Sequence, residues 1–320
     1  MWYLKARLYI LLAVLFGIVY TAVTVIGTSM GVTSFNFYLI LSLGLMFIQY
    51  MVGPKIVEWS MKVKYVGKSQ YPRLHQIIEE LAEKAGIPKP KVGVAQIAIP
   101  NAFAFGRGAA DGRVCVTTAI VQLLDERELR AVLGHEISHL KNRDVLFITV
   151  LSVIPMILYR LAWHFLWFGG GRRRNNGVST TLIGLAAFLF YFITNLLVLY
   201  GSRIREYFAD MGSVALGNQP EFMASALYKL VYGSARMSKQ ALKDTEGLKA
   251  FFVNDPSRAR KEINELAQID LDRSGTIDAS ELAAMHNKEL NLSFGDKMFE
   301  AFSTHPNMLK RIKQLSKYKM

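Results

Sequence analysis

The sequence has little cysteine and few acidic residues. The first shortage limits disulfides and thiolate metal sites, and the second leaves a net positive charge. Cys115 is the only cysteine among 320 residues, so the chain has no intramolecular disulfide and no set of thiolates for a structural zinc site. This cysteine lies in a strand-like run, where a thiol usually behaves as a small buried apolar group. Lysine and arginine number 38 against 25 aspartates and glutamates, a net charge of +13. We attribute the excess to contacts with anionic lipid headgroups rather than to nucleic-acid binding, the alternative source.

Charged residues are missing from Leu8 to Pro54, which indicates membrane insertion. A polar patch at 27–34 divides this run into halves near the roughly 20 residues that a membrane-crossing helix needs. We therefore predict a transmembrane hairpin with helices at 8–28 and 34–53. A cleaved signal peptide is the alternative for the first half, but no small-x-small cleavage site precedes the second half.

Two further apolar segments, Val145–Phe168 and Val178–Gly201, predict a second transmembrane pair. Lysines and arginines flank the first hairpin but are absent from its turn. The positive-inside rule therefore places the N-terminus and the catalytic part on the cytoplasmic side of a cell (inner) membrane. Arg172-Arg173-Arg174 disagrees with this topology if both later segments cross fully. We expect four spans, with a re-entrant loop or a non-crossing third segment as the alternatives.

The motif His135-Glu136-Ile137-Ser138-His139 is the most informative part of the sequence. Residues four apart lie on one face of a helix, so His135 and His139 can aim two nitrogens at one zinc ion. Glu136 lies beside that ion, where it can take a proton from water as the general base. Residues 125–133 are good helix formers with an acidic first turn. The glycine and third histidine that extend this motif in metzincins are absent.

A catalytic zinc site of this type needs a third protein ligand. Glu206 is the best candidate, because it lies in a helical pattern directly after an apolar segment. Asp210 lies four residues further on the same face, where it can accept a hydrogen bond from the non-ligating nitrogen of a zinc histidine. Taken alone, these charges fit a solvated helix face, but the incomplete zinc motif favours the metal site.

Four segments in this order resemble the HtpX-type membrane metalloproteases, kin of the CAAX prenyl proteases: Asn101–Gly106, His135–His139, Arg205–Asp210 and Ser303–Pro306. The resemblance covers most of the chain except residues 262–290. It implies a zinc endopeptidase that hydrolyses misfolded or excess membrane proteins, with polypeptides as substrates. A processing protease for one membrane or lipidated substrate is the alternative enzyme.

The resemblance also indicates where the substrate lies. Residues 101–106 resemble the family's edge strand, which can hold an extended peptide through main-chain hydrogen bonds. His305 is the candidate donor to the oxyanion, with a fourth zinc ligand and a structural histidine as alternatives. Arg311 also matches the family pattern, without an assigned role. The predicted substrate-binding residues are Asn101, Ala102, Phe103 and Ala104.

Residues 270–281 depart from the family pattern and predict a calcium site. They match a twelve-residue EF-hand loop, with Gly275 at the sharp turn of position 6. A second loop to pair with it is not evident, so weak binding, pairing between two molecules and Mg²⁺ binding stay open. We expect calcium to modulate the enzyme; a calcium-responsive membrane scaffold is the alternative from another class. The predicted ligands are Asp270, Asp272, Ser274, the Thr276 carbonyl, Asp278 and Glu281.

Together these patterns predict an α+β, mainly α-helical, multi-span membrane protein with a gluzincin-like catalytic domain. Its H-E-x-x-H helix should lie beside a small sheet with strands at 92–95, 102–105 and 114–117, and a helix at 71–85 should precede the sheet. The expected parts are a transmembrane hairpin (1–54), catalytic residues 55–144, a second transmembrane pair (145–201), catalytic residues 202–261, an EF-hand-like insertion (262–290) and a C-terminal catalytic segment (291–320).

Overall fold

The computed structural model describes residues 35–168, 180–236, 262–263, 266, 268–290 and 293–318. The expected first span at 8–28 and the run Arg172–Arg174 lie outside these residues. The chain divides into two compact units. Within the described residues, the first unit holds 35–51 and Leu146–Ile204, and the second holds Val52–Val145 and the chain from Arg205 onward.

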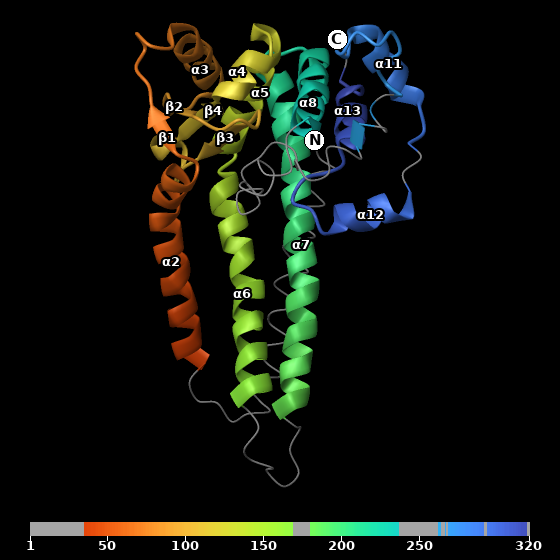
Figure 1. The fold of residues 1–320 in the computed structure, drawn as a ribbon. Helices are drawn as coiled ribbons and strands as arrows, with labels where there is room; N and C mark the ends of the chain where they lie inside the picture. The colour runs from red at the N-terminus through yellow and green to blue at the C-terminus, as the bar shows by residue number, and fades with distance from the viewer. Residues whose placement is uncertain are drawn as a thin grey trace. The chain divides into compact units, whose positions relative to one another are not determined.

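Long apolar helices make up the described part of the first unit (Figure 1). They are α2 (Phe35–Ser60), α6 (Asp144–Phe168) and α7 (Thr180–Ala215), and the ends of all three belong to the second unit. The stretch Thr181–Ala215 is long and apolar enough to cross a membrane, the one such helix among the described residues. The expected spans at 34–53 and Val145–Phe168 correspond to α2 and α6, and whether these helices cross a bilayer stays a prediction.

A four-stranded mixed sheet lies at the centre of the second unit, in the order β1-β2-β4-β3. The β2 and β4 strands are parallel, and the other pairs are antiparallel. The three expected strands are confirmed, whereas β1 has too few residues for a periodic signal. The edge position of β3, where β4 is its one partner among the described strands, agrees with the prediction. The strands are β1 (Val63–Tyr65), β2 (Lys91–Ala95), β3 (Ala102–Phe105) and β4 (Arg113–Thr117).

Alternation along the strands gives the sheet two apolar faces. Val114 and Val116 join the main core, which also contains residues of α3 (Pro72–Ala85) and α5 (Glu126–Lys141). On the other face, Cys115 is fully buried in a small cluster with Phe103 and Phe105 of β3 and Val57 and Met61 near the end of α2. The cysteine is therefore a packing residue, as the sequence predicts.

Short helices complete the second unit. The α5 helix packs against α3 and α8, and α13 packs against α8 and α11. The expected helix at 71–85 is α3, which ends at Gly86 in the left-handed conformation with a φ of 69°. The remaining helices of the described residues are α4 (Thr118–Leu123), α8 (Pro220–Ala235), α11 (Ala279–Asn287), α12 (Phe294–Ala301) and α13 (Met308–Leu315), with a 3-10 turn at Ala109–Asp111. The protein is thus mainly helical with a small mixed sheet, as predicted.

Candidate metal centre

A reciprocal capping box sets the start of the helix that carries the zinc motif. The Asp125 side chain accepts hydrogen bonds from the backbone N–H groups of Arg127 and Glu128, and Glu128 accepts one from the N–H of Asp125. Such a box satisfies N–H groups that a helix end leaves without intrahelical partners. It starts α5 so that the motif falls in the helix interior, where His135 and His139 are one turn apart.

Two glycines let α5 approach the last turns of α7 closely. A Cβ atom added at Gly134 would lie 2.8 Å from Ser213 Oγ, and one added at Gly212 would lie 2.3 Å from Ser138 Oγ. The Ser213 hydroxyl also donates a hydrogen bond to the Ala131 carbonyl at 2.6 Å. Only glycine leaves room for this crossing, which brings the acidic face of α7 against the two histidines.

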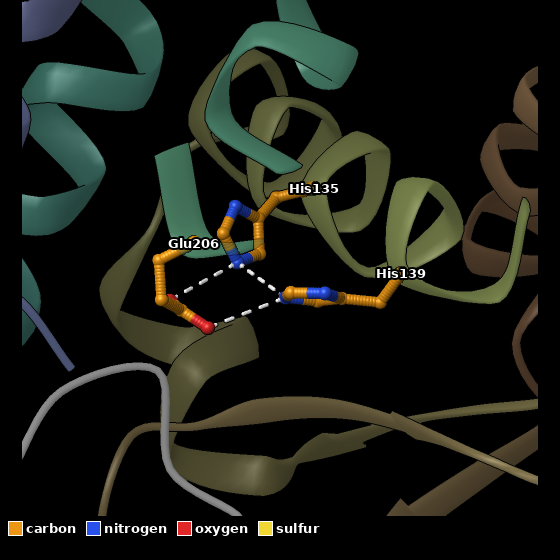
Figure 2. Close-up of side chains that lie close together, drawn as sticks. All are labelled: His135, His139 and Glu206. Atoms are coloured by element: carbon orange, nitrogen blue, oxygen red, sulfur yellow. Dashed lines mark hydrogen bonds and ion pairs between the residues drawn. The ribbon is translucent and has the colours of Figure 1, made fainter. Parts of the chain in front are cut away.

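Three donor side chains converge at this crossing, as Figure 2 shows. His135 Nε2 lies 3.0 Å from His139 Nε2 and 3.6 Å from Glu206 Oε2, and His139 Nε2 lies 3.5 Å from Glu206 Oε1. A tetrahedral zinc ion with bonds of about 2.0–2.1 Å needs donor atoms about 3.3–3.4 Å apart. The observed separations bracket that value, so the three residues predicted as ligands have the geometry for zinc.

The outer nitrogens of both histidines face carboxylates. His135 Nδ1 is 2.9 Å from Asp210 Oδ1, and His139 Nδ1 is 2.6 Å from Asp144 Oδ2. A carboxylate only accepts hydrogen bonds, so we assign the proton to each Nδ1, which leaves the Nε2 lone pairs pointing at one another. Two such lone pairs at 3.0 Å repel unless a cation lies between them. The hydrogen-bonding pattern of the donor set therefore also fits a metal ion.

Asp210 lies where its spacing from Glu206 predicts, whereas Asp144 was not predicted. Asp144 opens α6, just after α5 ends at Lys141, and it also forms an ion pair with Arg205. The turn at 142–143 between the two helices decides its direction, and no helical spacing rule covers such a turn.

Arg311 connects the carboxylates of the centre. Its guanidinium is fully buried and donates to Asp210 at 2.9 and 2.6 Å through Nε and Nη2, and its Nη1 lies 3.1 Å from Glu206 Oε2. It therefore holds both the residue that orients His135 and the third ligand. The sequence left this role open, because the partners are 101 residues apart and come from different helices.

Glu136 is buried beside the triad and next to the edge strand. Burial, together with the nearby Glu206 carboxylate, raises the pKa of Glu136 to about 7, while His139 and a hydrogen bond from the backbone amide of Ala104 act in the opposite direction. Ala104 lies in β3, so the candidate base is next to the strand predicted to bind substrate. Asn101, Ala102 and Phe103 are almost completely buried, and Ala104 is partly exposed.

His305 reaches the centre through Glu206. Its Nδ1 is 3.3 Å from Glu206 Oε2, and its ring is largely buried. Within the described residues neither ring nitrogen has a hydrogen bond of good geometry. The position keeps His305 next to the metal centre without separating its predicted roles as an oxyanion donor, a fourth ligand or a structural histidine.

Three carboxylates among the predicted ligands of the EF-hand-like loop lie close together. Asp270, Asp272 and Glu281 offer carboxylate oxygens within 4.8 Å of one another. Gly275 has a φ of 81°, as the turn at position 6 requires. The hydroxyls of Ser274 and Thr276 lie 2.9 Å apart, and Asp278 caps α11 by accepting from Glu281 N at 2.8 Å.

Comparison with known proteins identifies the family. Residues 68–319 match the model of Peptidase family M48. The chain belongs to this family. A "Protease HtpX homolog" of Methanothermobacter thermautotrophicus is 51% identical over 230 residues, which are 72% of this chain and 86% of that protein. "Protease HtpX homolog 2" of Methanosarcina acetivorans is 34% identical over 272 residues, 84% of this chain and 80% of that one.

A solved structure shares the fold of this M48 chain. The crystal structure of Ste24p from S. mikatae has a TM-score of 0.50 at 16% identity, with 99% of this chain and 66% of that chain covered. At this identity the match concerns the fold alone. Membership of M48, together with the triad of His135, His139 and Glu206, makes the protein a zinc metallopeptidase whose substrates are polypeptides.

Replacing Asp144 tests whether the carboxylates behind the histidines tune the metal centre. We expect Asp144→Asn to weaken zinc affinity about 10- to 100-fold, the usual cost of losing such a partner. Competition with a chromophoric zinc chelator measures the change. Asp111→Asn is the matched control, because Asp111 pairs with Arg107 and Arg113 away from the triad. An unchanged affinity in both variants would show that Asp144 does not support the site.

Proposed function

We propose that this M48 peptidase is a membrane-embedded endopeptidase that hydrolyses peptide bonds of misfolded or excess membrane proteins. The convergence of the two histidines and Glu206, with Glu136 buried next to the edge strand, is the observation that carries the proposal. The triad supports hydrolysis. The edge strand supports cleavage of many different sequences, because main-chain hydrogen bonds do not depend on substrate sequence.

We assign the catalytic roles to residues of the centre. Bound zinc supplies Lewis acidity, which polarises a carbonyl and lowers the pKa of water towards ~7. Glu136 accepts a proton from the attacking water and returns it to the leaving amine. Burial acts to raise the pKa of Glu136, which favours its service as a base. His305 donates a hydrogen bond to the oxyanion; zinc ligation by His305 would instead silence the enzyme.

The α7 helix supports the membrane location. Its described apolar side chains include several that are exposed: Leu182, Leu185, Phe188, Leu189 and Phe192. Exposed apolar residues in a helix long enough to cross a bilayer fit lipid contact. We propose a multi-pass protein of the cell (inner) membrane with its catalytic unit in the cytoplasm, where the basic flanks of the first hairpin would lie.

The proposal is tested by offering one membrane protein in folded and unfolded forms to detergent-purified enzyme reloaded with zinc. We expect many cuts in the unfolded form and few in the folded form, with both lost in the Glu136→Gln variant. A single cut at one position in either form would favour a processing protease. Full biological function of Glu136→Gln would favour the scaffold.

We also propose that residues 270–281 bind calcium and modulate the enzyme. Two of the three converging carboxylates, Asp270 and Glu281, are buried. Asp270 also accepts a hydrogen bond from Tyr228 Oη at 2.7 Å, and Tyr228 lies on α8, which packs against the zinc-motif helix α5. A cation that reorients Asp270 would therefore act on a helix in contact with the catalytic helix.

A Glu281→Gln variant tests the calcium site. We expect calcium affinity to fall at least tenfold, because the residue at position 12 supplies both carboxylate oxygens to the ion. Isothermal titration of calcium into the purified protein measures the affinity, with Glu289→Gln outside the loop as the control. Equal affinity in both variants would remove the site. Cleavage rates that do not change between chelator and millimolar calcium would remove the modulation.

A further inference from the structure

The α12 helix exposes its apolar side chains and buries its acidic ones. Met298 and Phe299 are 48% and 60% exposed, and Phe302, directly after the helix, is 52% exposed. Asp296 and Glu300 are only 5% and 7% exposed. A helix on a water-soluble surface has the opposite arrangement, because burial favours apolar groups and penalises carboxylates. The outer face of α12 is therefore suited to an apolar medium.

Protein partners hold the two acidic residues inward. Asp296 forms a reciprocal capping box with Ser293, whose hydroxyl lies 2.5 Å from Asp296 Oδ2, and Glu300 pairs with Lys310 of α13. Lys297 is exposed on the same helix. The exposed charge on the described side chains of α12 is thus positive, next to an apolar stripe. This combination complements the anionic headgroups and acyl chains at the surface of a bilayer.

The last turns of α2, in the same unit, also expose apolar side chains. Ile56 and Trp59, in the last turns of α2, are 54% and 83% exposed. Within the second unit, Figure 1 shows α12 on the side away from α3 and α11, which is also the side where α2 enters. Exposed tryptophan is typical of the boundary between membrane and water. Two separate segments of the catalytic unit therefore carry exposed side chains of the kind found at a membrane surface.

We propose that α12 is an interfacial helix that docks on the lipid bilayer, with Met298, Phe299 and Phe302 among the acyl chains and Lys297 at the headgroups. Eight residues span about 12 Å, too short to cross, so the helix lies along the surface. The proposal rests on the membrane location proposed above, but not on proteolysis. Since His305 follows Phe302 by three residues, docking attaches the His305 segment of the catalytic centre to the bilayer surface.

Spin labelling of the full-length protein in nanodiscs of phosphatidylcholine and phosphatidylglycerol tests the proposal. A nitroxide is attached at Phe299→Cys, or at Met298→Cys if the first variant binds no zinc. Cys115 stays unlabelled, because it is fully buried and burial raises the pKa of its thiol. Collisions with oxygen, which concentrates in lipid, are compared with collisions with a water-soluble nickel complex. The control label is at Glu83→Cys on the exposed side of α3.

We expect the ratio of oxygen to nickel collisions to be several-fold higher at residue 299 than at residue 83. Equal ratios would place α12 in water and overturn the proposal. Few collisions with either reagent would show that protein covers the face, and spin–spin broadening would identify a second copy as the cover; either result also overturns it. Zinc content of the same samples separates this question from the metal centre, since equal ratios with normal zinc would refute only the docking.

Discussion

Replacing Glu136 by glutamine should reduce cleavage of an unfolded membrane protein about 10²- to 10⁴-fold, the range for loss of a general acid–base group. Glutamine keeps the size and polarity of the side chain but cannot take a proton from water. Zinc should remain bound, because its three proposed ligands are unchanged. The measurement is the initial cleavage rate of wild type and variant, each with its zinc content determined.

The zinc content of the Glu136→Gln variant distinguishes a catalytic role of Glu136 from a structural one. A variant that loses both zinc and activity would show that Glu136 supports the structure of the centre, not only its chemistry. Cleavage at the wild-type rate with normal zinc would contradict the assignment of the base. His135→Ala provides the contrast, since removing a ligand should abolish zinc binding and activity together.

Replacing Arg311 by methionine should destabilise the protein by about 3–5 kcal/mol, because buried carboxylates lose their compensating charge. Asp210 and Glu206 both lie within 3.1 Å of the guanidinium, and Arg311 is fully buried. Methionine has a similar length but leaves these two acids without their cation. Thermal unfolding in detergent should show a midpoint lower by roughly 6–20 °C, scaled for a domain of this size.

Arg311→Lys is the matched variant for charge. Lysine restores a positive charge but not the two-pronged contact with Asp210, so we expect an intermediate loss of stability. Zinc affinity should fall in both variants, since Asp210 orients His135. A midpoint within 2 °C of wild type for Arg311→Met would show that the carboxylates are satisfied without the arginine.

The strands of the sheet and the zinc ligands could be predicted from local sequence patterns. Short strand-like runs predicted β2, β3 and β4, and the spacing of His135 and His139 placed both on one side of α5. Both patterns are local, because the period of a strand or a helix is set by its own backbone. The position of β3 at the sheet edge came from the family resemblance, not from periodicity.

Contacts that depend on how one helix is oriented relative to another could not be predicted from local patterns. Asp144 reaches His139 because of the turn that separates α5 from α6, and Arg311 of α13 reaches Asp210 of α7, which is a separate helix. The inverted exposure of α12 was also unpredicted, since Asp296 and Glu300 have the composition of an ordinary solvated helix face. Their burial follows from their partners, Ser293 and Lys310.

The chain by itself determines the elements, the zinc-binding residue types and the apolar segments, because each depends on neighbours within a few residues. It also carries the family assignment, since M48 membership follows from similarity of sequence. The folded structure adds the carboxylates behind the histidines, the arginine that joins Asp210 to Glu206 and the outward face of α12. Arg311 and Asp210 are 101 positions apart in the chain, and such meetings are decided by how helices pack, which no local pattern encodes.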